Sequence, residues 1–156
     1  EAIWTARIAI ELEIHLRDRG IEVMPISDGI YSARHKRVNA YQAHHPGPSV
    51  YLAMHLNAGG GDYGAWFYDH RSSQGAELAD SLCSALGPII EIPQKAIAAQ
   101  RSDWTKNAFN TIRGVGTPVA ICCEPFFIDT HARLLSIGGI SKVARGMAEG
   151  IIGWNQ

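Results

Sequence analysis

Two residues with acid–base or metal-binding side chains each follow directly on a run of apolar residues. His55 follows the run 50–54, and Glu124 follows the run 119–123. A neutral imidazole at the end of a strand can bind zinc or act as a base. It can equally be a core histidine that hydrogen-bonds to the backbone, and the spacing alone leaves both possibilities for His55 open.

Glu124 lies between its apolar run and the pair Phe126-Phe127. A carboxylate in such surroundings is poorly solvated, and desolvation raises its pKa, which suits a general acid or base. A buried structural ion pair is the alternative. We favour the catalytic interpretation, because a buried carboxylate without a partner is costly to keep.

Two further polar residues have weaker signals. Glu1 opens an amphipathic stretch, where an anion is stabilised by the helix dipole by about 0.3–1 kcal/mol, so simple helix capping explains it on its own. Asn57 lies two residues after His55 and would point to the same side of an extended chain. It can orient a ligand or substrate, or only hold the loop that follows.

The other candidate groups are expected to be structural. We expect surface positions for four histidines and a solvated basic cluster: His35, His44, His45 and His131, and Arg34, Lys36 and Arg37. Core packing is the preferred role for the aromatic residues that could otherwise stack on a sugar or peptide: Trp66, Tyr68 and Trp104.

The three cysteines are expected to be free and mostly buried thiols. A cysteine hydrolase that uses Cys122 or Cys123 with His55 or His131 is one alternative function. We rank it low, because adjacent cysteines late in an apolar strand are expected to be buried, whereas a nucleophilic thiolate needs exposure beside a base. The sequence contains no H-E-x-x-H, C-x-x-C, G-x-S-x-G or P-loop motif.

The elements that position these residues alternate between helices and strands. Apolar spacing predicts a helix over 2–19, a helix that Ser72 or Ser73 can cap and that runs to Leu86, and a last helix within 138–154. Residues 31–42 are polar and have helical potential. Gly20 is the expected stop of the first helix, and Gly87-Pro88 that of the helix that runs to Leu86. Short apolar runs predict strands over 21–26, 50–54, 65–68 and 118–123, with a flexible loop at 59–62, and residues 95–111 receive no clear assignment. This alternation predicts a single-domain α/β fold with an open, mostly parallel twisted sheet flanked by helices on both faces.

The composition of the chain excludes some classes of function. The 156 residues have a formal net charge of −1 and are 46% hydrophobic, which suits one globular domain. A near-neutral chain argues against nucleic-acid binding, which calls for an excess of Lys and Arg. No apolar run approaches the roughly 20 residues of a membrane span, and the chain begins without the basic and apolar regions of a signal peptide.

Taken in order, these motifs resemble the zinc-dependent N-acetylmuramoyl-L-alanine amidases of the Amidase_3 type, which are found in phage endolysins and bacterial autolysins. Residues 51–58 (YLAMHLNA) resemble the family's S-I-H-A-N-A motif, with Ala53 and Met54 in place of Ser and Ile. Residues 117–128 (TPVAICCEPFFI) resemble P-x-x-L-x-E-x-G-F-I, with Pro125 in place of the usual residue, Phe126 in place of Gly, and the glutamate in register. The glutamate, helix and glycine of 1–20 and the pair Arg34 and Asn39 also follow the family's order.

The resemblance implies zinc held by two histidines and a glutamate, with a second glutamate as the catalytic acid/base. Glu1 matches the glutamate ligand, His55 the second histidine ligand and Glu124 the catalytic residue. The family's first histidine lies upstream of the position of Glu1. Residues 1–156 are therefore expected to form the catalytic domain without its first strand and first ligand loop.

The implied reaction is hydrolysis of the amide between N-acetylmuramic acid and L-alanine in peptidoglycan, by a monomer that acts on the cell wall. A catalytically inactive peptidoglycan-binding module on the same fold is the main alternative, because it keeps the groove without a full ligand set.

Overall fold

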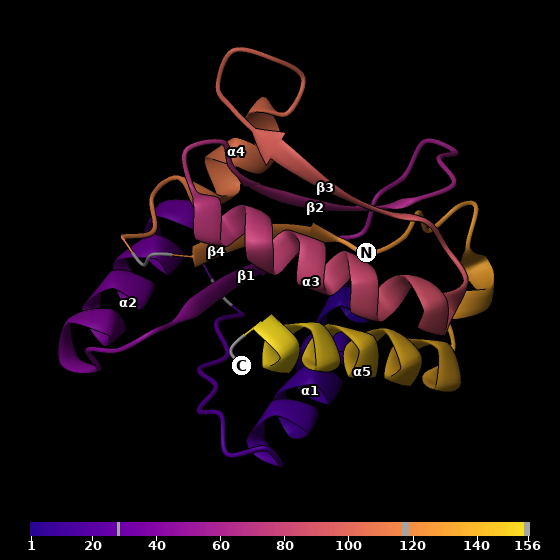
Figure 1. The fold of residues 1–156 in the computed structure, drawn as a ribbon, viewed down its shortest axis with the longest axis horizontal. Coiled ribbons are helices and arrows are strands. Elements are labelled where there is room, and N and C mark those ends of the chain that lie inside the picture. Colours follow the sequence, from indigo (N-terminus) through magenta and orange to yellow (C-terminus); the bar gives the residue numbers. More distant parts are fainter. Residues whose placement is uncertain (28, 117–118, 155–156) are drawn as a thin grey trace.

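The computed structural model describes residues 1–27, 29–116 and 119–154 (Figure 1). Over these residues the chain forms one small domain of five α-helices around a four-stranded sheet. In chain order the elements are α1 (Ala2–Arg17), α2 (Tyr31–His44), β1 (Val50–Met54), β2 (Gly64–Asp69), α3 (Ser73–Ile90), β3 (Gln94–Ala99), α4 (Lys106–Ile112), β4 (Val119–Glu124), a short 3-10 helix (Ala132–Leu134) and α5 (Ile137–Trp154). The predicted α/β class is confirmed.

The sheet is open and mixed, with strand order β1-β4-β2-β3. Strand β1 pairs in parallel with β4, from Val50 opposite Val119 to Met54 opposite Cys123. Strand β2 pairs in parallel with β3 and antiparallel with β4. The carboxyl ends of β1 and β4 therefore share one edge of the sheet, and those of β2 and β3 lie at the opposite edge.

Helices cover both faces of the sheet, as predicted. Helices α1, α3 and α5 pack into one apolar cluster on one face of the sheet. In Figure 1, α3 crosses in front of the strands and α5 lies in front of α1. Helix α4 packs on the other face against Phe67 and Cys122, and α2 is tied to α4 by a hydrogen bond between His35 and the carbonyl of Thr111. Because both faces are buried, β4 reads as a continuous apolar run up to Glu124.

Two glycines let α3 and α5 approach closely. A Cβ on Gly150 would lie 2.8 Å from the Cα of Leu82, and one on Gly146 would lie 2.6 Å from Cδ1 of Leu86. Leu82 and Leu86 are fully buried, so this contact is part of the core beneath the sheet.

The structure differs from the sequence-based prediction at two elements. Residues 21–26 were predicted to form a strand, which is wrong: they form no strand. Within the described residues β1 pairs only with β4 and its outer side is unpaired, so the backbone of 21–26 makes none of the ladder hydrogen bonds that define a strand. Helix α3 also continues through Pro88 to Ile90, because the buried side chains of Leu86 and Ile90 hold its last turns against the core.

The remaining elements follow the prediction closely. Helix α1 ends before Gly20, whose φ of 75° is the left-handed conformation expected of a helix stop. The unassigned region 95–111 contains most of β3 and α4. Pro118, the predicted first residue of the last strand, lies outside the described residues. None of the helices in the described part of the chain is long and apolar enough to cross a bilayer.

Candidate active site

The parallel pairing of β1 and β4 brings His55 and Glu124 to the same edge of the sheet. Each residue lies at the carboxyl end of its strand, where sites of open α/β sheets form. The backbone N–H of His55 donates to the carbonyl of Cys123 over 2.8 Å, so the ladder places His55 beside Glu124. The two residues that sequence spacing singled out are therefore neighbours in space.

The side chain of Glu1 joins them from the start of α1. Its Oε1 lies 3.1 Å from Nδ1 of His55 and 3.4 Å from the backbone nitrogen of Leu56. Glu1 occupies the N-cap position of α1, but its carboxylate makes no capping hydrogen bond. Helix capping therefore does not account for this side chain, which instead faces the histidine.

Glu124 is half-buried, and burial raises the pKa of its carboxyl above the ordinary value of 4.5. The electrostatic effect of His55 opposes this rise in the pKa of Glu124, and the negative charge of Glu1 adds to it. Nδ2 of Asn57 donates to Oε2 of Glu124 over 2.5 Å. Oδ1 of Asn57 accepts from the N–H of Ala58 over 2.8 Å, which fixes the direction of the amide. Asn57 thus both contacts Glu124 and holds the start of the following loop.

Tyr31 contacts the opposite side of the His55 ring. Its hydroxyl lies 2.9 Å from Nε2 of His55. Burial raises the pKa of the Tyr31 phenol, so the hydroxyl is neutral at pH 7 and can donate or accept. A shallow cavity of about 390 Å³ opens here, and its lining includes Glu1, Tyr31, Arg34, Met54 and His55. Sequence analysis did not select Tyr31, because no local pattern links it to a histidine 24 residues away.

The pair Glu1 and His55 has the chemistry of zinc ligands. Tetrahedral zinc with bonds of about 2.1 Å places neighbouring donor atoms about 3.4 Å apart, near the 3.1 Å between Oε1 of Glu1 and Nδ1 of His55. In the part of the chain that the structure describes, no group of three His, Cys, Asp or Glu residues is arranged to hold a metal ion. The donor pair fits zinc, and it is one short of the three protein ligands of a catalytic site.

The glycine loop at 59–62 forms a rim next to this edge and is fastened to the segment after β4. Oδ2 of Asp129 accepts from the N–H groups of Gly59 and Gly60 over 2.8 and 2.9 Å. Nε2 of His131 lies 2.9 Å from Oδ1 of Asp62. The loop predicted to be flexible is therefore tied down at both ends.

Two histidines expected at the surface are buried. His35 is 8% exposed and bonds to the Thr111 carbonyl, while His131 is 6% exposed and accepts from the N–H of Phe127. The polar sequence around each had suggested solvent, and tertiary packing of α2 and of the rim loop overrides it. Both have structural bonds away from His55, so neither joins the site.

Core packing, the role predicted for the three aromatic residues, is found for two of them and not for the third. Trp66 is fully buried and Tyr68 packs against the same core, which confirms packing for both, whereas Trp104 is 71% exposed. The expected burial of the thiols is confirmed for Cys122 and Cys123, and Cys83 is partly buried.

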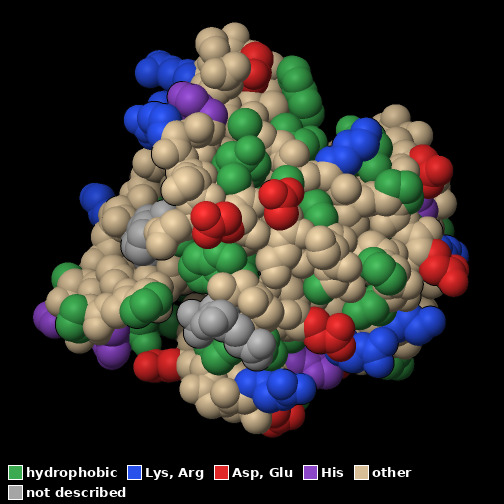
Figure 2. All heavy atoms as spheres, viewed as in Figure 1, with side chains coloured by type: hydrophobic (Ala, Val, Ile, Leu, Met, Phe, Trp, Pro, Cys, Tyr) green, Lys and Arg blue, Asp and Glu red, His purple; other side chains and the backbone are tan. Residues whose placement is uncertain are grey.

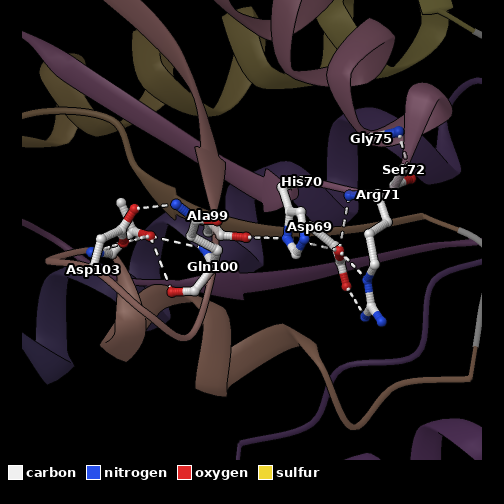
Figure 3. A network of polar contacts seen from close by, with 9 residues as sticks. Asp69, His70, Arg71, Ser72, Gly75, Ala99, Gln100 and Asp103 are labelled. Carbon is white, nitrogen blue, oxygen red and sulfur yellow. Dashed lines mark hydrogen bonds and ion pairs between the residues drawn. The ribbon is translucent and has the colours of Figure 1, made fainter.

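A second polar network lies at the opposite edge of the sheet, where β2 and β3 end (Figure 3). Asp69 accepts from Nε and Nη2 of Arg71 over 2.9 and 2.6 Å, which lowers the pKa of the Asp69 carboxyl. Gln100 and Asp103 close the neighbouring turn through a 2.8 Å hydrogen bond. Because β2 runs antiparallel to β4, these carboxylates are separated from Glu124 by the length of the strand.

The surface has no concentrated charge on the face that Figure 2 shows. Lys and Arg side chains lie there in separate small groups among acidic and apolar ones. This agrees with the near-neutral composition of the whole chain.

No protein-family model and no curated protein matches the sequence. Solved structures do match. The catalytic domain of CwlV, an N-acetylmuramoyl-L-alanine amidase from Bacillus (Paenibacillus) polymyxa, is 21% identical with a TM-score of 0.72, over 95% of this chain and 80% of that one. An N-acetylmuramoyl-L-alanine amidase from Clostridium difficile 630 is 20% identical with a TM-score of 0.74, over 96% and 80%. The catalytic domain of the endolysin CD27L, which targets Clostridia difficile, is 22% identical with a TM-score of 0.60, over 94% and 79%.

These structures share the fold of this chain over nearly its whole length. The resemblance inferred from the motifs is thus matched by an independent comparison of structures, and the architecture is that of the N-acetylmuramoyl-L-alanine amidases.

Proposed function

We propose that this chain is the catalytic domain of a zinc-dependent N-acetylmuramoyl-L-alanine amidase. The observation that carries the proposal is the meeting of Glu1, His55 and Glu124 at one edge of the sheet. They converge from three separate parts of the sequence, on a fold shared with amidases of that activity. Its substrate would be the amide between N-acetylmuramic acid and L-alanine in peptidoglycan, and it would act on the cell wall as a monomer.

Glu1 and His55 would hold the metal, through a carboxylate oxygen and through Nδ1. Bound there, zinc would supply Lewis acidity toward the amide carbonyl and toward water. Such a site needs a third protein ligand. In the part of the chain that the structure describes, no third His, Cys, Asp or Glu joins this pair.

Glu124 would act as the proton carrier. As a carboxylate it accepts a proton from the attacking water, and as an acid it delivers that proton to the departing alanine nitrogen. A raised pKa suits this double role, because both protonation states are then accessible nearer neutral pH. Among the residues that the structure describes, Asn57 donates to Oε2 of Glu124, so Oε1 would be the oxygen that receives the proton.

Digestion of purified peptidoglycan tests the proposal, with new alanine amino termini as the readout. Glu124→Gln should lower hydrolysis by about 10²–10⁴-fold and leave bound zinc unchanged, because proton transfer is lost but no ligand is. His55→Ala should lose zinc and activity together. Glu77→Gln is the matched control, since Glu77 is exposed on α3 and should keep full activity.

Near-full hydrolysis by Glu124→Gln would show that another group moves the proton. Zinc retained in full by His55→Ala would remove His55 from the ligand set.

An inactive peptidoglycan-binding module is the second candidate. The observation in its favour is that the described residues bring together two metal donors and not three. Such a module would co-sediment with insoluble peptidoglycan, hold no zinc and release no alanine amino groups. An active amidase would release them in a chelator-sensitive way, so one sedimentation and release assay separates the two.

A further inference from the structure

The two ring nitrogens of His55 face two different partners. Nδ1 lies 3.1 Å from the carboxylate of Glu1, and Nε2 lies 2.9 Å from the hydroxyl of Tyr31. A neutral imidazole carries one proton, so the partner of one nitrogen decides whether the other is free to bind a metal. Metal-binding histidines usually donate their second N–H to a carboxylate, a carbonyl or water.

Tyr31 is well placed to control that proton. It is the first residue of α2, and its ring lies 6.2 Å from the rings of both His35 and His55. His35 is in turn anchored by its 2.8 Å bond to the carbonyl of Thr111. Cζ of Arg34 lies over the Tyr31 ring, 5.7 Å from its centre. Residues of α2 therefore hold the Tyr31 ring in place, and its hydroxyl contacts His55 at the end of β1.

We propose that Tyr31 is a positioning residue for His55: its hydroxyl accepts the Nε2–H of the ring and so presents the Nδ1 lone pair beside Glu1. The proposal rests on the proposed zinc function. It goes beyond that function by assigning a role to a residue outside the ligand and catalytic set.

A tyrosine hydroxyl differs from the usual partners because it can also donate. Without metal, Nδ1–H can donate to Glu1 while the Tyr31 O–H donates to Nε2, and every group has a partner. With Nδ1 as a ligand, the proton lies on Nε2 and the Tyr31 oxygen accepts it. The same contact therefore holds the ring in one orientation in both states, and no net proton is gained or lost by the ring.

Tyr31→Phe tests the proposal, because it removes the hydroxyl and keeps the packing of the ring. Tyr51→Phe is the matched control: Tyr51 lies nearby on β1 against His35, and among the described residues its hydroxyl makes no hydrogen bond. One readout is the zinc dissociation constant, measured by competition with a chromophoric chelator. The other is the protonation of the two His55 nitrogens, observed by long-range ¹H–¹⁵N NMR of the full chain with and without zinc.

Tyr31→Phe should weaken zinc binding by about 10–100-fold, the usual effect of losing the outer partner of a histidine ligand. In the metal-free protein its His55 nitrogen shifts should move toward those of a mobile ring that exchanges between tautomers. Tyr51→Phe should stay within about twofold of the wild type in affinity, with unchanged His55 shifts.

Wild-type affinity and wild-type His55 shifts in Tyr31→Phe would overturn the role of Tyr31 and leave the proposed function standing. If the wild-type chain itself binds no zinc, the proposed function fails. The metal-free NMR comparison then decides by itself whether Tyr31 orients the ring.

Discussion

At the scale of single residues, burial controls which side chains of β4 can do chemistry. Glu124 is half-buried at the end of the strand, with Asn57 on one oxygen. Cys122 and Cys123 lie just before it in the core, where burial raises the pKa of the Cys122 thiol to about 12 and that of Cys123 well above 9.0. The carboxylate is available to a proton, whereas the thiols are kept neutral.

The thiols should therefore resist alkylation in the folded protein. With a pKa of about 12, only about one Cys122 thiol in ten thousand is ionised at pH 8, and the reactive thiolate becomes common only as the pH approaches 12. Iodoacetamide at pH 8 should leave Cys122 and Cys123 unmodified by mass spectrometry and leave hydrolysis intact. The chain unfolded in guanidinium should react at all three cysteines. Rapid modification of native Cys122 with loss of activity would revive the cysteine hydrolase.

At the scale of elements, the α3–α5 contact depends on the absence of a side chain at Gly150. Gly150→Ala would place a methyl 2.8 Å from the Cα of Leu82, where backbone must move to admit it. We expect a loss of about 1–3 kcal/mol in the free energy of unfolding, measured by urea denaturation. Gly138→Ala in the same helix meets nothing within 4 Å, and should change stability by less than about 1 kcal/mol, in the stabilising direction. Equal effects at both positions would refute the close contact.

The rim loop depends on Asp129 in a comparable way. Hydrogen bonds from the N–H groups of Gly59 and Gly60 hold the pKa of the Asp129 carboxyl below its usual value of 3.8. The ionised form is thus the one that fastens the loop, and the fastening is present above that pKa and lost as the pH falls through it. Backbone amide NMR signals of Gly59 and Gly60 should stay constant from pH 7 to 5.

Substitution separates this anchor from the rest of the loop. Asp129→Ala should shift the Gly59 and Gly60 signals at neutral pH, because the carboxylate oxygen that accepts from both N–H groups is lost. Asp129→Asn should shift them less, since one acceptor oxygen remains. Unchanged signals in Asp129→Ala would mean that the bond between His131 and Asp62 holds the loop alone.

At the scale of the whole molecule, we expect the fold to be stable without the proposed metal. Two apolar clusters, one on each face of the sheet, contain neither Glu1 nor His55. Removing zinc with a chelator should leave the far-ultraviolet circular dichroism unchanged and lower the melting temperature. At a zinc concentration of 100 times Kd, binding contributes about 2.7 kcal/mol, or roughly 5–10 °C for a domain of this size. His55→Ala should melt at the same temperature with and without zinc.

A zinc-dependent shift of equal size in His55→Ala would place the metal elsewhere in the molecule. Unfolding on chelation alone would show a structural role for the metal instead of a catalytic one.

The sequence alone determined the parts of this protein that depend on local pattern. Apolar runs that end in His55 and Glu124 identified two strand ends with chemistry, and helical spacing located α1, α3 and α5. These features are readable because burial imposes a period on the residues that line a core. The order of the motifs pointed to the same fold that the solved amidases share.

Only the tertiary structure decided which of these residues meet. The parallel pairing of β1 with β4 brings His55 to Glu124, and the course of α1 and α2 brings Glu1 and Tyr31 to the two nitrogens of His55. The burial of His35 and the absence of a strand at 21–26 were likewise settled by neighbours distant in sequence. Such contacts join residues far apart in the sequence, as between His35 and Thr111, which are 76 positions apart, and local spacing holds no information about them.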